Sequence, residues 1–118
     1  MLSYALRIVT TLLQKMTEER AAQAEHLRLA VREQLRTALR EILPDTMPVT
    51  VFGSLTKAGR FTATSDVDIA LIEEPPEMSI YQLTAQLSER LGRRVDVVLL
   101  SECRFRDKVL REGENWTL

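Results

Sequence analysis

Two segments decide the fold of this chain: VTVFGS at residues 49–54 and DVDIA at residues 66–70. Both contain the β-branched and apolar residues that are typical of strands. The first ends in Gly53-Ser54, a turn small enough for backbone N–H groups to approach a phosphate. In the second, Asp66 and Asp68 share one face because strand side chains alternate. Paired carboxylates favour a hard divalent cation such as Mg²⁺, so the two segments indicate chemistry on a nucleoside triphosphate.

A third acid strengthens this interpretation. The run RVDVVLL at residues 94–100 is a further strand candidate, and Asp96 is its only carboxylate. A charged group in an apolar strand is costly unless it is paired or bound to a metal. If this strand lies beside residues 66–70, three carboxylates converge. They could then hold two metal ions roughly 3.5–4 Å apart, as in phosphoryl transfer.

Each acid also has a plainer interpretation. Asp66 and Asp68 could lie on a polar strand edge that faces water, since such alternation is common. Asp96 could form an ion pair with Arg93 or Arg94. Because all three acids occur with the Gly-Ser turn, we favour metal binding over these alternatives.

The rest of the chain divides at its glycines and prolines. Residues 1–43 contain neither, and their apolar residues recur at helical spacing, which predicts helix. Thr17 is placed to cap a second helix, so residues 1–16 are a candidate for a separate amphipathic helix. Met16 raises the alternative that translation begins there. The run PDTMP at residues 44–48 is a clear break.

The remaining elements complete a fold of the α/β class. Strands are expected at 49–53, 66–72 and 94–100, and helices at 79–92 and about 102–112, with an edge strand at 115–118. Ser79 and Gln82 form a capping box, and Gly92 is a stop signal. We therefore expect one domain, a two-layer sandwich with a small mixed sheet and flanking helices. It comprises a helical segment, 1–43, and a core, 44–118.

Composition narrows the class of protein. The chain has 118 residues, 45% of them hydrophobic, which suits a single core. Its net charge of −1 gives no reason to expect direct binding of nucleic acid. The single Cys103 fits a reducing cytoplasm. No apolar run reaches the ~20 residues of a membrane helix, and a signal peptide is not expected because Arg7 interrupts the apolar start.

Gly53-Ser54, the element Ser65–Asp68 and Asp96 together resemble the signature of the DNA polymerase β-type nucleotidyltransferase superfamily. The likeness is strongest to its minimal members, the MNT antitoxins that are encoded beside HEPN-domain toxins. It covers roughly residues 48–118 and includes the tail KVLREG at 108–113. The loop between Ser54 and Asp66 is one residue longer than is usual in the family. We place the extra residue within 57–60, because loops absorb insertions readily.

The resemblance implies roles for the site residues. Asp66 and Asp68 would bind two Mg²⁺ ions, or Mn²⁺ in their place. Asp96 would bind the catalytic ion and assist the attacking hydroxyl as a base. Gly53 and Ser54 would hold the β- and γ-phosphates of ATP.

Three further polar residues lie near these motifs. Lys57 and Arg60 could neutralise the triphosphate, and either could equally be a solvated loop cation. Ser65 is a candidate nucleotide-binding residue by resemblance, and loop capping is its plainer role.

Three functions follow as hypotheses. The first is transfer of AMP from ATP to a tyrosine hydroxyl of a HEPN ribonuclease toxin, which would make this chain the antitoxin. The second is a non-catalytic antitoxin that masks its partner through residues 1–43. The third is a small-molecule nucleotidyltransferase of the aminoglycoside type, ranked last because those enzymes usually carry an extra helical domain. The N-terminal helix could also join copies of this chain.

Other features of the sequence support no separate chemistry. Arg28, Arg32, Arg36 and Arg40 form a stripe at helical spacing. We interpret it as a solvated flank, with a basic surface for an acidic partner or for its bound RNA as the alternative. His26 has no nucleophile to form a triad, and Cys103 has no companion at zinc spacing.

Overall fold

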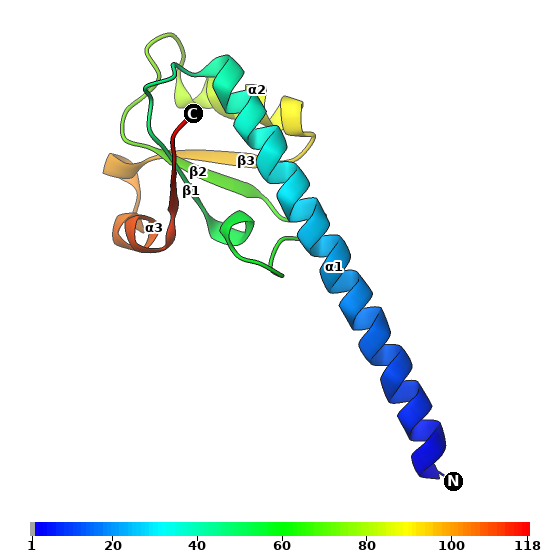
Figure 1. Cartoon of the computed structure of the whole chain (residues 1–118). Coiled ribbons are helices and arrows are strands. Elements are labelled where there is room, and N and C mark those ends of the chain that lie inside the picture. Colours follow the sequence, from blue (N-terminus) through cyan, green and yellow to red (C-terminus); the bar gives the residue numbers. More distant parts are fainter. Residues whose placement is uncertain (1) are drawn as a thin grey trace.

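A four-stranded mixed sheet forms the centre of the fold (Figure 1). The computed structural model describes residues 2–118. Its elements are α1 (Leu2–Ile42), β1 (Val49–Phe52), a 3₁₀ turn (Gly53–Thr56), β2 (Val67–Leu71), α2 (Ile80–Leu91), β3 (Val95–Leu99), a second 3₁₀ turn (Leu100–Glu102), α3 (Arg106–Glu112) and β4 (Glu114–Trp116).

The strand order is β3-β2-β1-β4. Strand β1 pairs antiparallel with both β2 and β4, whereas β2 and β3 are parallel. The crossover between the parallel strands is α2. This confirms the predicted α/β fold with a small mixed sheet.

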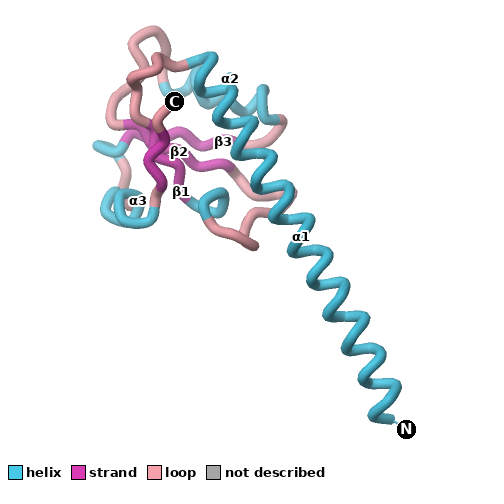
Figure 2. Tube along the Cα trace, in the orientation of Figure 1, coloured by secondary structure: helices cyan, strands magenta, loops and turns pink. Residues whose placement is uncertain are grey.

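The two faces of the sheet have different covers. Helices α1 and α2 bury Leu35, Leu39, Leu83 and Leu87 against one face, in the main core. Helix α3 packs Val109 against the other face, in a smaller cluster. Figure 2 shows α3 on the other side of the strands from α1. Helix α3 has only seven residues, and Asp68, Asp96 and Val98 on that second face are only partly buried.

Local signals place most element ends correctly. Ser79 and Gln82 form the predicted capping box, and Gly92 ends α2 in the left-handed region with φ +64°. The last helix was predicted from about residue 102, but α3 begins at Arg106, because residues 100–102 close a 3₁₀ turn instead. Strand β4 lies at the sheet edge, as expected, although it spans Glu114–Trp116 rather than 115–118.

The expectation of a separate helix before Thr17 is wrong. Helix α1 is continuous from Leu2 to Ile42. The Thr17 hydroxyl donates to the Leu13 carbonyl at 2.9 Å, as in a helix interior, instead of capping a new start. No glycine or proline interrupts the segment, so nothing stops the helix from propagating.

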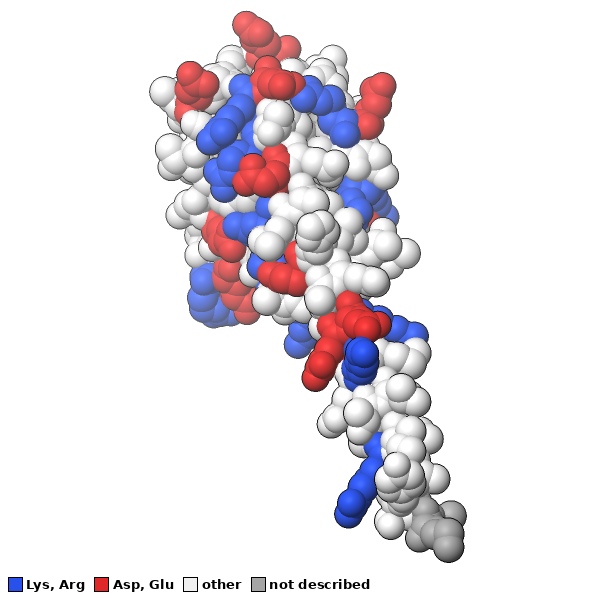
Figure 3. All heavy atoms as spheres, turned by 45° about the vertical axis from the view of Figure 1, so that its right-hand side comes forward, with Lys and Arg blue, Asp and Glu red and all other residues white. Residues whose placement is uncertain are grey.

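The first half of α1 projects from the body of the protein (Figure 1). The molecule measures 69 × 28 × 21 Å as a result. Figure 3 shows few charges on this projecting part. Its large apolar side chains are exposed: Tyr4, Leu6, Ile8, Val9, Leu12, Leu13 and Met16. None of the helices within residues 2–118 is long and apolar enough to span a membrane.

The arginine stripe of α1 is not the solvated flank that the sequence suggested. Arg28, Arg32 and Arg36 are partly buried, and only Arg40 is exposed. The Arg36 guanidinium lies over the Trp116 ring, 4.3 Å from its centroid. Arg28 and Arg32 face the turn after β1, where they contact the Leu55 carbonyl. Arg32 and Arg36 face β4.

Candidate active site

The three predicted acids meet at one edge of the sheet. Asp68 and Asp96 are direct partners in the parallel register of β2 and β3. Asp66 comes two residues before Asp68, just ahead of β2. Val67, between Asp66 and Asp68, is fully buried in the main core. Because strand side chains alternate, Asp66 and Asp68 lie on the opposite face of the sheet. The predicted convergence of the carboxylates is therefore present in the fold.

The negative charge of the three carboxylates is only partly balanced by a nearby cation. Burial, followed by the charges of Asp96 and Asp66, raises the pKa of Asp68 to about 6. The Arg94 guanidinium opposes part of this rise. Arg94 Nε lies 3.3 Å from Asp96 Oδ1 and 3.9 Å from Asp66 Oδ2. The ion pair considered for Asp96 thus exists, with Arg94 rather than Arg93, but 71% of the Arg94 side chain is exposed and such pairs are weak.

The donor set at this edge fits Mg²⁺, which prefers carboxylate oxygens. Within residues 2–118, no three His, Cys, Asp or Glu side chains are arranged as they stand to hold a metal ion. Arg94 lies against two of the three acids instead. The half-buried Asp68, repelled by two neighbours, is the observation that suits a cation. Metal binding by Asp66, Asp68 and Asp96 stays a prediction.

The Gly-Ser turn lies directly beside Asp68. Gly53 has φ +76°, which side chains rarely allow. A Cβ atom on Gly53 would stand 2.5 Å from Asp68 Oδ2, far closer than van der Waals contact. Glycine is therefore required both by the turn and by the neighbouring carboxylate. The half-buried Ser54 follows within the same 3₁₀ turn.

A cavity of about 250 Å³ opens between this turn and α3. Its lining combines an acid of the cluster, two lysines, an aromatic ring and a glutamate: Phe52, Gly53, Lys57, Asp68, Phe105, Lys108, Val109 and Glu112. Lys57 Nζ lies 3.8 Å from Glu112 Oε2 across the cavity. Lysines beside a carboxylate cluster suit a ligand that carries phosphates.

Five residues of this lining were not predicted as site residues from the sequence, and three of them, Phe105, Lys108 and Glu112, bring an aromatic ring or a charge to the cavity. Phe105 received no site role from the sequence, and 68% of its surface is exposed. Lys108 and Glu112 were given no role. Positions 105, 108, 109 and 112 recur at helical spacing, and this shared face was the available signal.

The other predicted binding residues lie outside the cavity lining. Ser65 caps its own loop: its hydroxyl accepts a hydrogen bond from the Thr62 N–H at 2.9 Å. Its carbonyl accepts from Arg93 Nη1 at 3.1 Å. Arg60 is exposed on the loop after the turn. A contact of Ser65 or Ser54 with nucleotide stays a prediction.

The Asp68 pKa predicts an unusual pH dependence of stability without metal. Because the pKa of Asp68 is raised above its unfolded value, the folded state binds more protons, and stability falls as pH rises towards and through 6. We expect the free energy of unfolding in EDTA to drop by about 1 kcal/mol from pH 5 to 7.5, after allowance for solvent screening. Urea titration at both values measures this.

The matched variant for this measurement is Asp68→Asn, which should lose that part of the drop. The lowered pKa values of Glu25 and Glu114 act below this window, since their stabilisation is lost only as pH falls below 4.5, their usual value. An equal drop in wild type and variant would contradict the assignment to Asp68.

Comparisons with known proteins identify a family and a fold. Residues 33–115 match the family described as "Polymerase beta, Nucleotidyltransferase". No curated protein sequence matches the chain.

Solved structures share the fold. One chain of a toxin–antitoxin crystallised with AMP-PNP is 24% identical, with a TM-score of 0.56 over 73% of each chain. A chain of the toxin–antitoxin MntA–HepT is 21% identical, with a TM-score of 0.53 over 76% of this chain and 73% of that one. A chain of the complex of tri-AMPylated Shewanella oneidensis HEPN toxin with MNT antitoxin is 18% identical, with a TM-score of 0.51 over 77% and 73%. At such identities the likeness establishes the nucleotidyltransferase fold.

Proposed function

Because the chain belongs to the polymerase beta nucleotidyltransferase family, we propose that it transfers AMP from ATP to a hydroxyl of a HEPN-type toxin and so acts as the antitoxin. Family membership confirms the prediction of a nucleotidyltransferase. The nucleotide, the acceptor and the biological role are the proposed part. The single free Cys103 suits the reducing cytoplasm, which is the location we propose.

One observation carries this proposal: the three carboxylates, the left-handed Gly53 and the lysine-lined cavity adjoin one another. Asp68 links these features. It is the register partner of Asp96, it lies next to Gly53, and it lines the cavity. A triphosphate in the cavity would place its phosphates between lysines and the carboxylate cluster. A plain polar strand edge would not combine these features.

The residues of the chain would divide the reaction between them. The turn at Gly53-Ser54 binds the β- and γ-phosphates, and Lys57 and Lys108 neutralise their charge. Asp96 accepts the proton of the attacking hydroxyl. The acceptor oxygen then forms its bond to the α-phosphorus as the bond to pyrophosphate breaks, and pyrophosphate leaves.

Asp66, Asp68 and Asp96 would hold the divalent cation. When bound, Mg²⁺ supplies charge neutralisation for the phosphates and lowers the pKa of the attacking group. Arg94 must leave Asp66 and Asp96 when the cation binds, and its high exposure makes that move inexpensive.

The acceptor is proposed to come from another macromolecule. Phe105, at the mouth of the cavity, is 68% exposed, so the site opens to the surface. In the Shewanella oneidensis complex the HEPN toxin itself is tri-AMPylated. A tyrosine hydroxyl of such a toxin suits this site, and an added AMP would bring bulk and negative charge to it.

The test uses the purified chain, Mg²⁺, the product of the neighbouring gene and ATP labelled at the α-phosphate. The expected result is label on a tyrosine of the partner. ATP labelled at the γ-phosphate should give none, which separates AMP transfer from phosphorylation. Absence of α-label from a folded partner would overturn the proposal.

A second function, masking without catalysis, is supported by the projecting half of α1. Its exposed apolar side chains, defined here as the apolar face, contact nothing in the body of the protein. A helix with such a face commonly docks into a groove of a partner. We propose that this face binds the HEPN-type toxin. Association of two copies of this chain, considered for the same helix, stays a prediction.

Charge on the apolar face should prevent that docking. We expect Val9→Glu/Met16→Glu to weaken partner binding at least about 100-fold, close to 3 kcal/mol, because two carboxylates would be desolvated. Isothermal titration calorimetry measures the affinity. The matched control is Thr10→Glu/Gln14→Glu, which adds the same charge to the polar side of the same turns. Equal affinity of the two variants would contradict docking through this face.

A further inference from the structure

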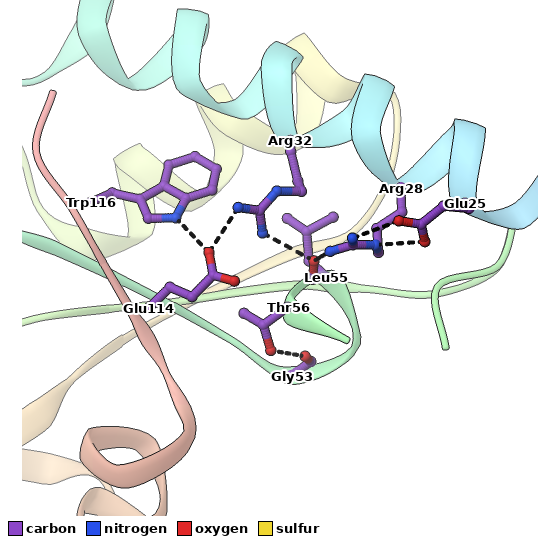
Figure 4. Close-up of polar contacts among 8 residues, drawn as sticks. All are labelled: Glu25, Arg28, Arg32, Gly53, Leu55, Thr56, Glu114 and Trp116. Atoms are coloured by element: carbon purple, nitrogen blue, oxygen red, sulfur yellow. Dashed lines mark hydrogen bonds and ion pairs between the residues drawn. The ribbon is translucent and has the colours of Figure 1, made fainter. Parts of the chain in front are cut away.

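Two arginines of α1 reach the turn that carries Gly53 (Figure 4). Arg28 Nη1 donates a hydrogen bond to the Leu55 carbonyl at 3.0 Å, and Arg32 Nη1 donates to the same oxygen at 3.3 Å. Only 13% and 21% of these side chains are exposed. Both lone pairs of one carbonyl are thereby used. Two hydrogen bonds from charged donors tie the turn to the helix.

The guanidinium groups are themselves held in place. Arg28 binds both oxygens of Glu25, at 2.9 and 2.6 Å. Arg32 Nη2 donates to Glu114 Oε2 at 2.8 Å, and the same oxygen accepts from Trp116 Nε1 at 3.2 Å. These hydrogen bonds lower the pKa of both glutamates. Because each guanidinium is planar and held in this way, its Nη1–H group points in a fixed direction, towards the Leu55 carbonyl.

The turn has little freedom left. The Leu55 side chain is fully buried, and its carbonyl is held from the α1 side. Within the turn, Thr56 Oγ1 donates to the Gly53 carbonyl at 2.8 Å. The Lys57 N–H donates to the Ser54 carbonyl at 3.1 Å. Carbonyl and N–H groups of a helical turn point in opposite directions, so a fixed carbonyl end also fixes where the first N–H groups point.

We propose that Arg28 and Arg32 are positioning residues that hold the Gly53–Thr56 turn ready for the phosphates of a nucleoside triphosphate. This inference rests on the proposed function, since it assigns the turn to phosphate. The arginines act through the Leu55 carbonyl and do not contact the ligand. A preorganised turn binds without losing further conformational freedom. Because it holds the phosphates before and during reaction, its loss should raise KM for ATP more than it lowers kcat.

The test compares two double variants that remove the same charge from the same stripe. Arg28→Gln/Arg32→Gln deletes both donors to Leu55, whereas Arg36→Gln/Arg40→Gln leaves them intact. The probe is inorganic tripolyphosphate with Mg²⁺, measured by calorimetry. We expect the first variant to lose affinity by about tenfold or more and the second by less than about threefold. Equal losses would overturn the inference and point to simple charge.

Two further measurements keep the outcome clear. Hydrogen exchange of the Lys57 N–H, which reports the turn without any ligand, should be faster in the first variant and unchanged in the second. Arg28→Lys/Arg32→Lys keeps the charge but not the paired geometry, and should recover only part of the affinity. Unchanged exchange at Lys57 would contradict positioning. If wild type binds neither ATP nor tripolyphosphate, the proposed function fails, and exchange still decides whether the arginines hold the turn.

Discussion

Replacing Asp66 and Asp68 together with alanine is expected to abolish AMP transfer while the chain remains folded. The two acids lie on one face of the sheet, and Asp68 both lines the cavity and is the register partner of Asp96. Without them the site loses the charge that would hold a divalent cation against the phosphates. We expect the rate of label transfer to fall at least about 10³-fold, or about 4 kcal/mol of transition-state stabilisation.

Stability should not fall in parallel. The raised pKa of Asp68 shows that its charge is disfavoured where it lies, so removing it relieves repulsion. Urea titration at pH 7.5 should find the double variant at least as stable as wild type. The control is Asp107→Ala, an exposed acid in the first turn of α3 that does not line the cavity. A double variant that still transfers label within about tenfold of wild type would contradict the assignment.

The same variant separates the two proposed functions in cells. If protection from the toxin requires transfer of AMP, the double variant fails to protect. If the apolar face of α1 masks the toxin, the variant still protects, and Val9→Glu/Met16→Glu does not. Growth of cells that express toxin with each variant gives the answer.

Gly53→Ala is expected to have the second largest effect, on both stability and activity. The new Cβ would lie 2.5 Å from Asp68 Oδ2 and on a backbone with φ +76°. Either the turn or the carboxylate must move. A displacement of about 1 Å in a site can cost about 10² in rate, and we expect label transfer to fall by at least that factor.

Gly59→Ala is the matched control for this substitution. Gly59 has the same φ of +76°, but a Cβ there meets nothing within 4 Å. It should cost only the backbone strain, about 1 kcal/mol by urea titration, with label transfer preserved. Equal loss of activity in the two variants would show that strain in the loop, and not contact with Asp68, is responsible.

Local patterns in the sequence were sufficient for most of the architecture. Strand alternation put Asp66 and Asp68 on one face, and the capping box at Ser79 with the stop at Gly92 placed α2. These signals work because they act between residues a few positions apart, whose geometry the backbone sets. They failed at Thr17, where a residue able to cap a helix is simply part of a longer one.

Only the tertiary structure decided which distant groups meet. The pairing of Asp68 with Asp96 depends on the parallel register of β2 and β3. Three further contacts depend on how the turn and the helices pack against the sheet. Gly53 lies against Asp68, α3 lines one side of the cavity, and Arg28 and Arg32 hydrogen-bond to the Leu55 carbonyl. The residues next to each of these groups in the sequence do not predict such partners. Many arrangements of the chain have similar local energies, and long-range packing decides which of them forms.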